Sequence, residues 1–323
     1  MTTLAILHPI NLLGKELRET LGRGVAGPQW QEVRLLSSIE EEVGTLTEIG
    51  GAAAIVQRYE PGSLDGVAAA FFCGPIAANR GILAELPADV TGVVLSPDAS
   101  AADGHPVVAG INARPAAAHG GSNVLLSPHP AAVLLAHLLQ PLASLEIQDA
   151  VATVVLPASL HDDAGVDELV GQARQIVAMV PRRRSQVFGA QLAFNLLPAA
   201  SQEESVASIA AELALVLPLP PSTPPIAIQL VQGGIFHCLA ISLHVRSATR
   251  SSAAAIRKSI AASPYIELAS DPRHLGPIDA AASEKVLLGA VRRDEWGVWL
   301  WAAMDNLTRG GALNALEIAT AVH

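Results

Sequence analysis

The chain has 323 residues, of which 50% are hydrophobic, 3% aromatic and 15% charged, so it is long enough for two domains with their own cores. Its formal net charge of -10 leaves no excess of lysine and arginine to neutralise phosphates, which argues against a nucleic-acid partner. No apolar run approaches the roughly 18 residues of a membrane-spanning helix. The two cysteines, Cys73 and Cys238, are far apart in apolar settings. We therefore expect a cytoplasmic protein with reduced thiols and no membrane contact.

The first third of the sequence alternates between strand and helix patterns. Strand-like apolar runs occupy residues 3–7, 33–36, 51–56, 67–72 and 91–95, and helical patterns occupy residues 14–21 and 76–86. Strands interleaved with helices predict a parallel, doubly wound sheet. Cys73 follows one of these strands, and no charged or imidazole neighbour in the sequence would activate its thiol. We interpret it as a small buried hydrophobic residue.

The turn between the first strand and the first helix reads His8-Pro9-Ile10-Asn11-Leu12-Leu13-Gly14. A dinucleotide-binding fold places a glycine-rich turn here, so that backbone N–H groups can approach a pyrophosphate. Only Gly14 is a glycine, Pro9 has no N–H to donate, and His8 carries a side chain at the place of closest approach. The motif therefore favours a connection without a ligand. If a nucleotide binds, we expect it to contact the end of this turn: Asn11, Leu12, Leu13 and Gly14.

The stretch 123–142 lies at the centre of the chain and organises the rest. Residues 123–126 are typical of a buried strand and residues 131–140 of an apolar helix, for which Ser127 is the expected N-cap. In α/β proteins such a turn, at the carboxyl edge of a sheet, is where ligands bind and nucleophiles are mounted. This turn contains Ser127 and His129 but no cysteine. A Ser127/His129 hydrolase is disfavoured, because no orienting acid or set of oxyanion donors can be identified.

The second part of the chain mixes strands and helices with longer connections. Strand patterns occur at residues 150–156, 225–230, 238–245, 286–291 and 298–303, and helix patterns at residues 166–180, 205–217, 251–262 and 306–322. We interpret the basic run Arg182, Arg183 and Arg184 as a solvated loop, and Asp162 and Asp163 as charges that complement the dipole of the following helix. The ten histidines form no ligand cluster, so no metal site is expected.

The run that begins at Trp299, W-L-W-A-A-M-D-N-L-T-R-G-G-A-L-N-A-L-E-I-A, strongly resembles the signature of the aspartate-semialdehyde dehydrogenase family, D-N-L-R-K-G-A-A-L-N-A-V-Q-I-A. Two further stretches support the resemblance: F-G-A-Q-L-A-F-N-L-L-P from Phe188, and the central stretch, where the family has N-P-N-C-T-T. The resemblance covers nearly the whole chain and implies an α/β fold of two domains. The first is a Rossmann-like domain with a doubly wound parallel sheet, formed by residues 1–123 and completed by residues 306–323. The second is an α+β dimerisation domain with a mixed sheet, residues 124–305.

The resemblance also locates the positions at which the family carries its chemistry. In the family, the enzyme reduces aspartyl phosphate with NADPH through a thioester on the cysteine of the central stretch. That cysteine falls on Pro130, and the family's glutamine, in T-Y-Q-A-V-S-G-A-G, falls on Val155. The phosphate-binding arginine falls near Ala101, and the glutamate and lysine of E-E-W-K fall near Ser205 and Ser208.

The family's substrate arginine and histidine come from R-V-P-V-x-x-G-H-S, and two registers fit this sequence. One keeps the histidine as His237 and puts Leu230 at the arginine. The other needs no gap and puts Gln232 at the arginine and Leu239 at the histidine. Neither register keeps the arginine.

The chain thus resembles the family's Usg-like branch, which lacks the catalytic cysteine. Loss of nearly all the functional residues, with the fold signatures retained, indicates a fold kept for another purpose. We expect a catalytically inactive, homodimeric paralogue with an interaction or regulatory role, with no catalytic residues and no tightly bound cofactor. The true dehydrogenase and a small metabolite are the further candidate partners.

The alternative is an NADP-dependent and phosphate-dependent semialdehyde dehydrogenase of amino-acid biosynthesis with a rearranged active site. Cys238 beside His237 would be its substitute nucleophile and base. Adjacent residues of a strand point to opposite faces, which argues against this pair.

Overall fold

The computed structural model describes residues 2–24, 30–114, 121–145, 147–181, 184–200, 202–217, 226–248 and 251–322. The chain divides into two compact units, residues 1–129 with 311–323 and residues 130–310. No helix in the described part of the chain is long and apolar enough to cross a membrane. The expected basic loop lies partly outside the described residues, because Arg182 and Arg183 are not among them.

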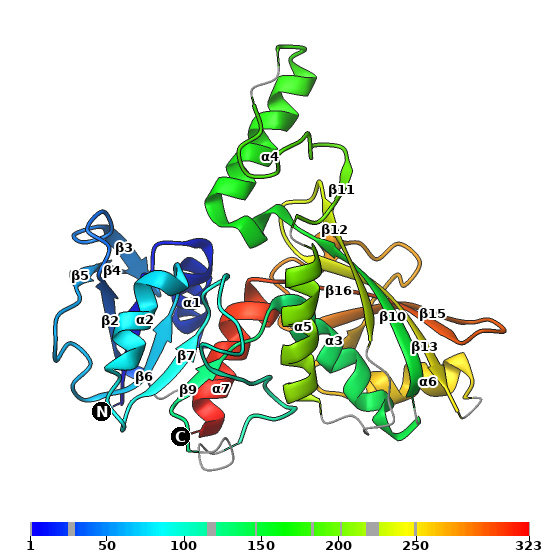
Figure 1. The fold of residues 1–323 in the computed structure, drawn as a ribbon, viewed down its shortest axis with the longest axis horizontal. Coiled ribbons are helices and arrows are strands. Elements are labelled where there is room, and N and C mark those ends of the chain that lie inside the picture. The colour runs from blue at the N-terminus through cyan, green and yellow to red at the C-terminus, as the bar shows by residue number, and fades with distance from the viewer. Residues whose placement is uncertain are drawn as a thin grey trace. The chain divides into compact units, whose positions relative to one another are not determined.

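The first unit is built on a seven-stranded sheet in which every pairing is parallel (Figure 1). The strand order is β5-β2-β1-β6-β7-β9-β8. The predicted Rossmann-like, doubly wound sheet is therefore confirmed. The strands are β1 (Thr2–Leu7), β2 (Trp30–Ser37), β5 (Gln57–Arg58), β6 (Val67–Phe72), β7 (Thr91–Val94), β8 (His105–Pro106) and β9 (Val124–Leu126), and the helices are α1 (Leu12–Gly22), α2 (Ile76–Ala84) and α7 (Leu313–Val322).

The core of this unit lies on both faces of the sheet, because successive residues of a strand point in opposite directions. On one face, Leu4 and Phe71 pack with Leu17 of α1 and Leu316 of α7. Strand residues of the other parity pack with α2 in a second cluster that includes Ala5, Leu7, Phe72, Ile76 and Ile82. The last helix of the chain is thus part of the core of the first unit.

The expected strand at residues 51–56 is not a member of the parallel sheet. Residues Ala52–Ile55 form β4, which pairs antiparallel with β3 (Leu46–Ile49) in a separate two-stranded sheet. Gly50 and Gly51 join the two strands with φ angles of 55° and 80°. These left-handed conformations are the ones that a two-residue hairpin turn requires, and the adjacent glycines are the signal that predicts a hairpin here.

Two helix starts also differ from the expectation. The helix expected from residue 306 begins with a π-helical turn, Thr308–Ala312, and becomes α-helical at Leu313. Ser127 is not the N-cap of the central helix, because α3 (Pro130–Leu139) begins three residues later. The Ser127 hydroxyl instead accepts a hydrogen bond from the Asn314 side-chain amide at 2.9 Å. A proline suits the first helical position, where its missing N–H would have no partner within the helix.

The second unit contains the mixed sheet that the family resemblance predicted, and this prediction is confirmed. Its strand order is β11-β12-β10-β13-β16-β15-β14, with parallel pairs β10–β12 and β14–β15 and antiparallel pairs elsewhere. The strands are β10 (Ile147–Leu156), β11 (Leu196–Pro198), β12 (Ala227–Gly233), β13 (Leu239–Ser247), β14 (Ile266–Leu268), β15 (Val286–Arg293) and β16 (Val298–Met304). The further helices are α4 (Asp162–Val177), α5 (Gln202–Val216) and α6 (Ala253–Ala261).

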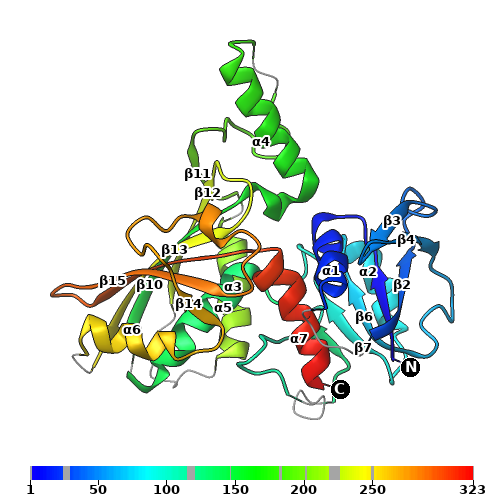
Figure 2. The same cartoon turned by 180° about the vertical axis from the view of Figure 1, so that it is seen from behind.

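The two faces of this mixed sheet differ in how well they are covered. Helices α3 and α5 lie over one face (Figures 1 and 2), and the even-numbered residues of β10 from Ala150 to Leu156 are buried. On the other face Val151 is 47% exposed. Strand register places His244 beside Val151 and Trp299 beside His244. We call the face that carries Val151, Thr153, Val155, His244 and Trp299 the open face.

The buried side chains of His137 and Arg309 stack with the half-buried Tyr265 in the second unit. The His137 ring of α3 stacks on the Tyr265 ring, with centroids 4.9 Å apart, and the Arg309 guanidinium lies 5.3 Å from the Tyr265 ring centroid. Burial, and to a smaller extent the positive charge of Arg309, lower the pKa of His137 to about 3. His137 is therefore neutral in the folded protein at physiological pH.

We predict that His137 makes the fold sensitive to acid. In the unfolded chain a histidine takes up a proton near pH 6.5, whereas folded His137 takes it up only near its lowered pKa of about 3. Between these values the unfolded state binds more protons, so the free energy of unfolding falls by about 1.4 kcal/mol per pH unit as the pH is lowered. Urea unfolding between pH 6.5 and pH 5 should show a loss of stability that is smaller by about 2 kcal/mol in His137→Phe than in the wild type.

The matched control is His274→Gln. His274 is exposed, and its hydrogen bond with Asp271 raises its pKa, so its removal cannot make the protein less sensitive to acid. An equal pH dependence in the wild type and in His137→Phe would contradict the prediction.

Candidate functional site

The turn after β1 is filled by the side chain of His8. His8 is fully buried and adopts a left-handed backbone conformation with φ of 53°. Its Nδ1 lies 2.9 Å from the Ser37 hydroxyl at the end of β2, and its Nε2 lies 3.4 Å from the Ser38 hydroxyl. A Cβ on Gly74, which follows β6, would lie 2.8 Å from the His8 Cβ. The carboxyl ends of β1, β2 and β6 are thus packed around this imidazole.

The start of α1 is capped by the chain itself. Asn11 is the N-cap, and its side-chain oxygen accepts a hydrogen bond from the Gly14 N–H at 2.8 Å. A Cβ on Gly14 would lie 2.5 Å from the Pro9 carbonyl oxygen, so this glycine is required for close packing of the helix on the turn. Leu12 and Leu13 begin the helix and are half-buried. Of the four residues expected to contact a nucleotide, two are therefore engaged with each other.

In the second unit, Pro130 is the first residue of α3 and is half-buried. A Cβ on Gly310 would lie 3.0 Å from the Pro130 Cβ and 2.8 Å from the Met304 Cε. The helix start therefore packs closely on the turn that follows β16. In the first unit, burial lowers the pKa of His129 to about 4, which keeps its imidazole neutral.

The end of the mixed sheet carries Gln232 and Leu239, the residues that one register places at the family's arginine and histidine. Gln232 is buried, and its amide donates a hydrogen bond to the Leu156 carbonyl oxygen at 3.0 Å. Since that end of the amide donates, the Gln232 oxygen accepts a hydrogen bond from His161 Nε2, at 3.2 Å. Both ends of this side chain are engaged within the protein.

Val155 is not brought together with Gln232. In the parallel pairing of β10 and β12, Leu156 lies beside Gln232, and Val155 lies beside Val231. Because side chains alternate along a strand, Val155 projects from the opposite face. It packs there against Gly233, where a Cβ would lie 2.7 Å from the Val155 Cγ1.

Cys238 and His237 precede β13 rather than belonging to it, so the expected strand start at residue 238 is wrong. Cys238 is buried and adopts a left-handed conformation with φ of 72°, while His237 is exposed. The Cys238 N–H donates a hydrogen bond to the Asn306 side-chain oxygen at 2.8 Å. Burial, together with the charge and hydrogen bond of Asp305, strongly raises the pKa of the Cys238 thiol. This thiol is protonated at neutral pH and is a poor nucleophile.

The remaining candidate positions lie apart from the sheet end. Ala101 is half-buried in a loop of the first unit, and the nearby Asp103 is engaged by Arg80 at 2.9 Å. Ser205 and Ser208 are on α5, where the Ser208 hydroxyl donates a hydrogen bond to the Glu212 carboxylate. No group of three or more potential metal ligands occurs among the residues that the structure describes.

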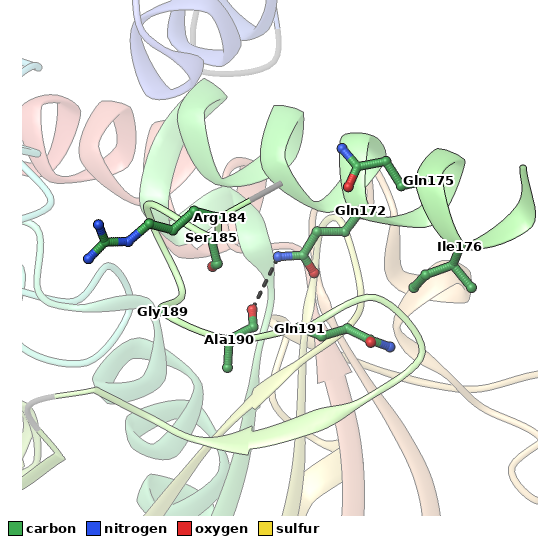
Figure 3. A pocket seen from close by; sticks show the side chains of 8 residues that line it. All are labelled: Gln172, Gln175, Ile176, Arg184, Ser185, Gly189, Ala190 and Gln191. Carbon is green, nitrogen blue, oxygen red and sulfur yellow. Dashed lines mark hydrogen bonds between the residues drawn. The ribbon is translucent and has the colours of Figure 1, made fainter. Parts of the chain in front are cut away.

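A cavity of about 280 Å³ lies between α4 and residues 184–191 (Figure 3). The Gln172 amide donates a hydrogen bond to the Ala190 carbonyl oxygen, and its oxygen accepts from the N–H groups of Leu192 and Ala193. These hydrogen bonds hold residues 190–193 against α4 and fix one wall of the cavity. The lining residues are Gln172, Gln175, Ile176, Arg184, Ser185, Gly189, Ala190 and Gln191.

Two sets of hydrogen bonds at the end of the mixed sheet could not be predicted from the sequence. His161 belongs to no recognisable motif, and it binds Gln232, which lies 71 positions further along the chain. Asn306 joins the Cys238 N–H to the Ser159 hydroxyl, across separations of 68 and 147 positions. Contacts between residues so far apart leave no local signal in a single sequence.

Comparisons with known proteins agree with this architecture. The semialdehyde dehydrogenase dimerisation domain matches residues 139–309, which is more than half of the chain. Two solved structures have a TM-score of 0.86 to this one. Aspartate semialdehyde dehydrogenase II complexed with ASA from Vibrio cholerae is 22% identical, and the match covers 100% of this chain and 98% of that one. A probable aspartate-semialdehyde dehydrogenase from Pseudomonas aeruginosa is 24% identical, and the match covers 99% of this chain and 97% of that one. At these identities the structural likeness establishes the fold.

Two curated relatives are similar to the chain over part of its length. Aspartate-semialdehyde dehydrogenase 2 of Vibrio cholerae is 27% identical over 66% of this chain and 66% of its own length. The USG-1 protein homolog of Pseudomonas aeruginosa is 28% identical over 65% of each. The matched stretches thus span just under two thirds of these relatives. By the match of its dimerisation domain, the chain belongs to the semialdehyde dehydrogenase family.

Proposed function

We propose that this protein is a homodimeric member of the family that does not carry out the dehydrogenase reaction and acts as an interaction or regulatory protein. The proposal rests on the hydrogen bonds of Gln232 at the end of the mixed sheet, where both the oxygen and the nitrogen of its amide are bonded within the protein. A neutral amide that is engaged in this way cannot supply the charge-assisted, bidentate contact that an arginine makes with a substrate carboxylate. The start of α3 likewise presents Pro130, which has neither a thiol nor a hydroxyl.

The backbone supports the register that places Gln232 at the family's arginine. In that register the glycine of R-V-P-V-x-x-G-H-S falls on Cys238, whose φ of 72° is a conformation that glycine adopts most readily. The other register puts this glycine on Phe236 and keeps the histidine as His237. With the first register, Leu239 stands at the histidine and the exposed His237 is not the family's residue.

Strand geometry likewise supports Leu156, rather than Val155, as the glutamine position. Leu156 is beside Gln232 in the sheet, whereas Val155 belongs to the open face. Shifting the family's Q-A-V-S by one residue places it on Leu156-Pro157-Ala158-Ser159 and matches the serine. Either position carries an aliphatic side chain, so neither supplies the amide of the family's glutamine.

The alternative of a rearranged NADP-dependent dehydrogenase has little support in the chemistry of its thiols. Acyl transfer through a thioester requires a thiolate. Of the two cysteines, Cys73 is fully buried, and Cys238 is buried with a strongly raised pKa. We therefore assign no nucleophile to this chain.

The turn that follows β1 in the first unit should weaken the binding of a nucleotide. A pyrophosphate at the start of α1 would compete with Asn11 for the Gly14 N–H, and it would meet the His8 ring at the strand ends. We predict a dissociation constant for NADPH in the millimolar range by isothermal titration, which corresponds to about 4 kcal/mol. His8→Gly, which suits the positive φ and empties this space, should bind more tightly than the wild type. A micromolar constant for the wild type would support the dehydrogenase alternative.

We predict that restoring the nucleophile alone does not restore activity. Pro130→Cys places a thiol at the start of α3, where the helix dipole favours the thiolate. The charge-assisted contacts to the substrate remain absent, and two such contacts, at about 1.5–3 kcal/mol each, account for a loss of roughly 10²- to 10⁴-fold in rate. The assay is phosphate-dependent NADP reduction with aspartate semialdehyde. Titration with a disulfide reagent verifies that the new thiol is reactive, and robust turnover by this single variant would overturn the proposal.

A homodimer is supported by the matched dimerisation domain and by the open face, on which Val151 is 47% exposed. A two-fold pairing would let this apolar surface of one protomer cover that of its partner. Sedimentation equilibrium should give twice the chain mass of 33.4 kDa at micromolar concentration. Val151→Asp should shift the protein toward the monomer, because it buries a charge without a partner. Leu46→Asp, at an exposed position of the first unit, is the control and should leave the dimer intact.

A further inference from the structure

The cavity between α4 and residues 184–191 is separate from the positions at which the family carries its chemistry. None of its lining residues is one of those positions. Its volume of about 280 Å³ corresponds to roughly nine water molecules, at about 30 Å³ each. Pockets for drug-sized ligands start at about 300 Å³, so this cavity has the size for a small metabolite.

The walls of the cavity are held in place by two side chains of α4. The Glu168 carboxylate accepts hydrogen bonds from the Ser185 hydroxyl at 2.6 Å and from the next two backbone N–H groups at 2.7 and 2.8 Å. The Gln172 amide donates to the Glu168 carboxylate at 3.0 Å and to the Ala190 carbonyl oxygen at 3.1 Å, while its oxygen accepts from two backbone N–H groups. The hydrogen-bonding capacity of this amide is thus used within the protein. Walls that are already ordered lose little conformational entropy when a ligand binds.

One end of the cavity carries a positive charge. Arg184 is the charged residue of the lining, and Figure 3 shows its guanidinium at one end of the lining side chains. This side chain is exposed and makes no ion pair within the described part of the chain. A guanidinium binds a carboxylate through two parallel hydrogen bonds, and the charges of the two groups balance. A phosphate group carries up to two negative charges, which a single arginine does not balance. The lining therefore favours a carboxylate.

The other end of the cavity carries neutral polar groups. The amides of Gln175 and Gln191 lie there, away from the Arg184 guanidinium (Figure 3). The Gln191 amide nitrogen donates a hydrogen bond to the Ala193 carbonyl oxygen at 3.0 Å, whereas its side-chain oxygen accepts none within the described part of the chain. An amide oxygen in this state can accept a hydrogen bond from an amine or amide N–H of a ligand. Ile176 adds an apolar surface to the lining.

We propose that this cavity binds a small carboxylate whose carbon chain ends in an amine or amide N–H, the class that includes amino acids with long polar side chains. Arg184 binds the carboxylate, the Gln191 side-chain oxygen accepts a hydrogen bond from the distal N–H, and Ile176 contacts the methylene groups. The inference names the ligand class for the regulatory role proposed above. It rests on that proposed function for the purpose of binding, while the binding itself is measured independently.

The two ends of the cavity can be tested separately with three probes on the full chain. The probes are ε-aminocaproate, caproate, which lacks the amine, and hexylamine, which lacks the carboxylate, and ligand-observed NMR gives their dissociation constants. Arg184→Gln should weaken ε-aminocaproate and caproate by roughly tenfold or more and leave hexylamine unchanged, because it removes the charged fork. Gln191→Met should weaken ε-aminocaproate and hexylamine by roughly tenfold and leave caproate unchanged. Retained caproate binding would show that the cavity persists in Gln191→Met without the hydrogen bond to Ala193.

The matched control is Arg174→Gln. Arg174 is an exposed residue of α4 outside the lining, so this change removes the same charge from the same helix and should leave all three constants unchanged. Inorganic phosphate should displace ε-aminocaproate less effectively than caproate does, and the reverse order would overturn the assignment of a carboxylate.

Two further results would contradict the site itself. One is a wild-type protein that does not bind ε-aminocaproate at about 10 mM, and the other is an equal loss of affinity in Arg174→Gln and Arg184→Gln. Neither result bears on whether the protein catalyses the dehydrogenase reaction. Conversely, dehydrogenase turnover by the wild type would overturn the proposed function and leave a demonstrated ligand site in place.

Discussion

The end of the mixed sheet is held together by the turn that follows β16. The Asp305 carboxylate accepts hydrogen bonds from the N–H groups of Ala282, Leu307 and Thr308. The next residue, Asn306, binds the Cys238 N–H and the Ser159 hydroxyl. Asp305, Asn306, Cys238 and Ser159 are buried, so their polar groups depend on these hydrogen bonds in place of water. The start of β13, the segment after β10 and the turn toward the last helix are therefore fixed as one assembly.

This assembly explains how the family signature can be kept for structural reasons alone. The D-N-L run that carries the resemblance is used by the fold, since Asp305 and Asn306 bind backbone groups of distant segments. Residues of the family's reaction occupy other positions, and these can change while the assembly persists. At two such places this chain satisfies its polar groups internally, through Asn11 in the first unit and Gln232 in the second. The fold and the family's reaction thus depend on different side chains.

The sequence was most informative where a local pattern determines the structure. Alternation of strands and helices predicted the parallel sheet, because the order of elements limits how they can pack. It failed at residues 51–56, where an apolar run looked like another parallel strand and the adjacent glycines Gly50 and Gly51 made a hairpin instead. Two features could be read directly from the sequence: the absence of cysteine from the central turn, and the single glycine in the turn that follows β1.

What the sequence did not reveal depends on tertiary contacts or on backbone angles. Val155 and Gln232 lie on opposite faces of the mixed sheet, which can be known only from the register of β10 against β12. The positive φ at Cys238 favours the register that places the family's glycine there. It could not be predicted from the sequence, because cysteine rarely adopts a left-handed conformation. The positive φ of 54° at Met179 likewise becomes visible only when the end of α4 is known.

The two hydrogen bonds of the Gln232 amide limit which side chains this position can accept. An arginine at this buried position would bring a charge to a place where the Leu156 carbonyl oxygen and the His161 ring are already matched to a neutral amide. A buried charge without a counterion costs several kcal/mol, which is a large part of the stability of an ordinary domain. An arginine introduced here by a single substitution would therefore come at the expense of stability. The internal hydrogen bonds make a neutral side chain the favoured occupant of this position.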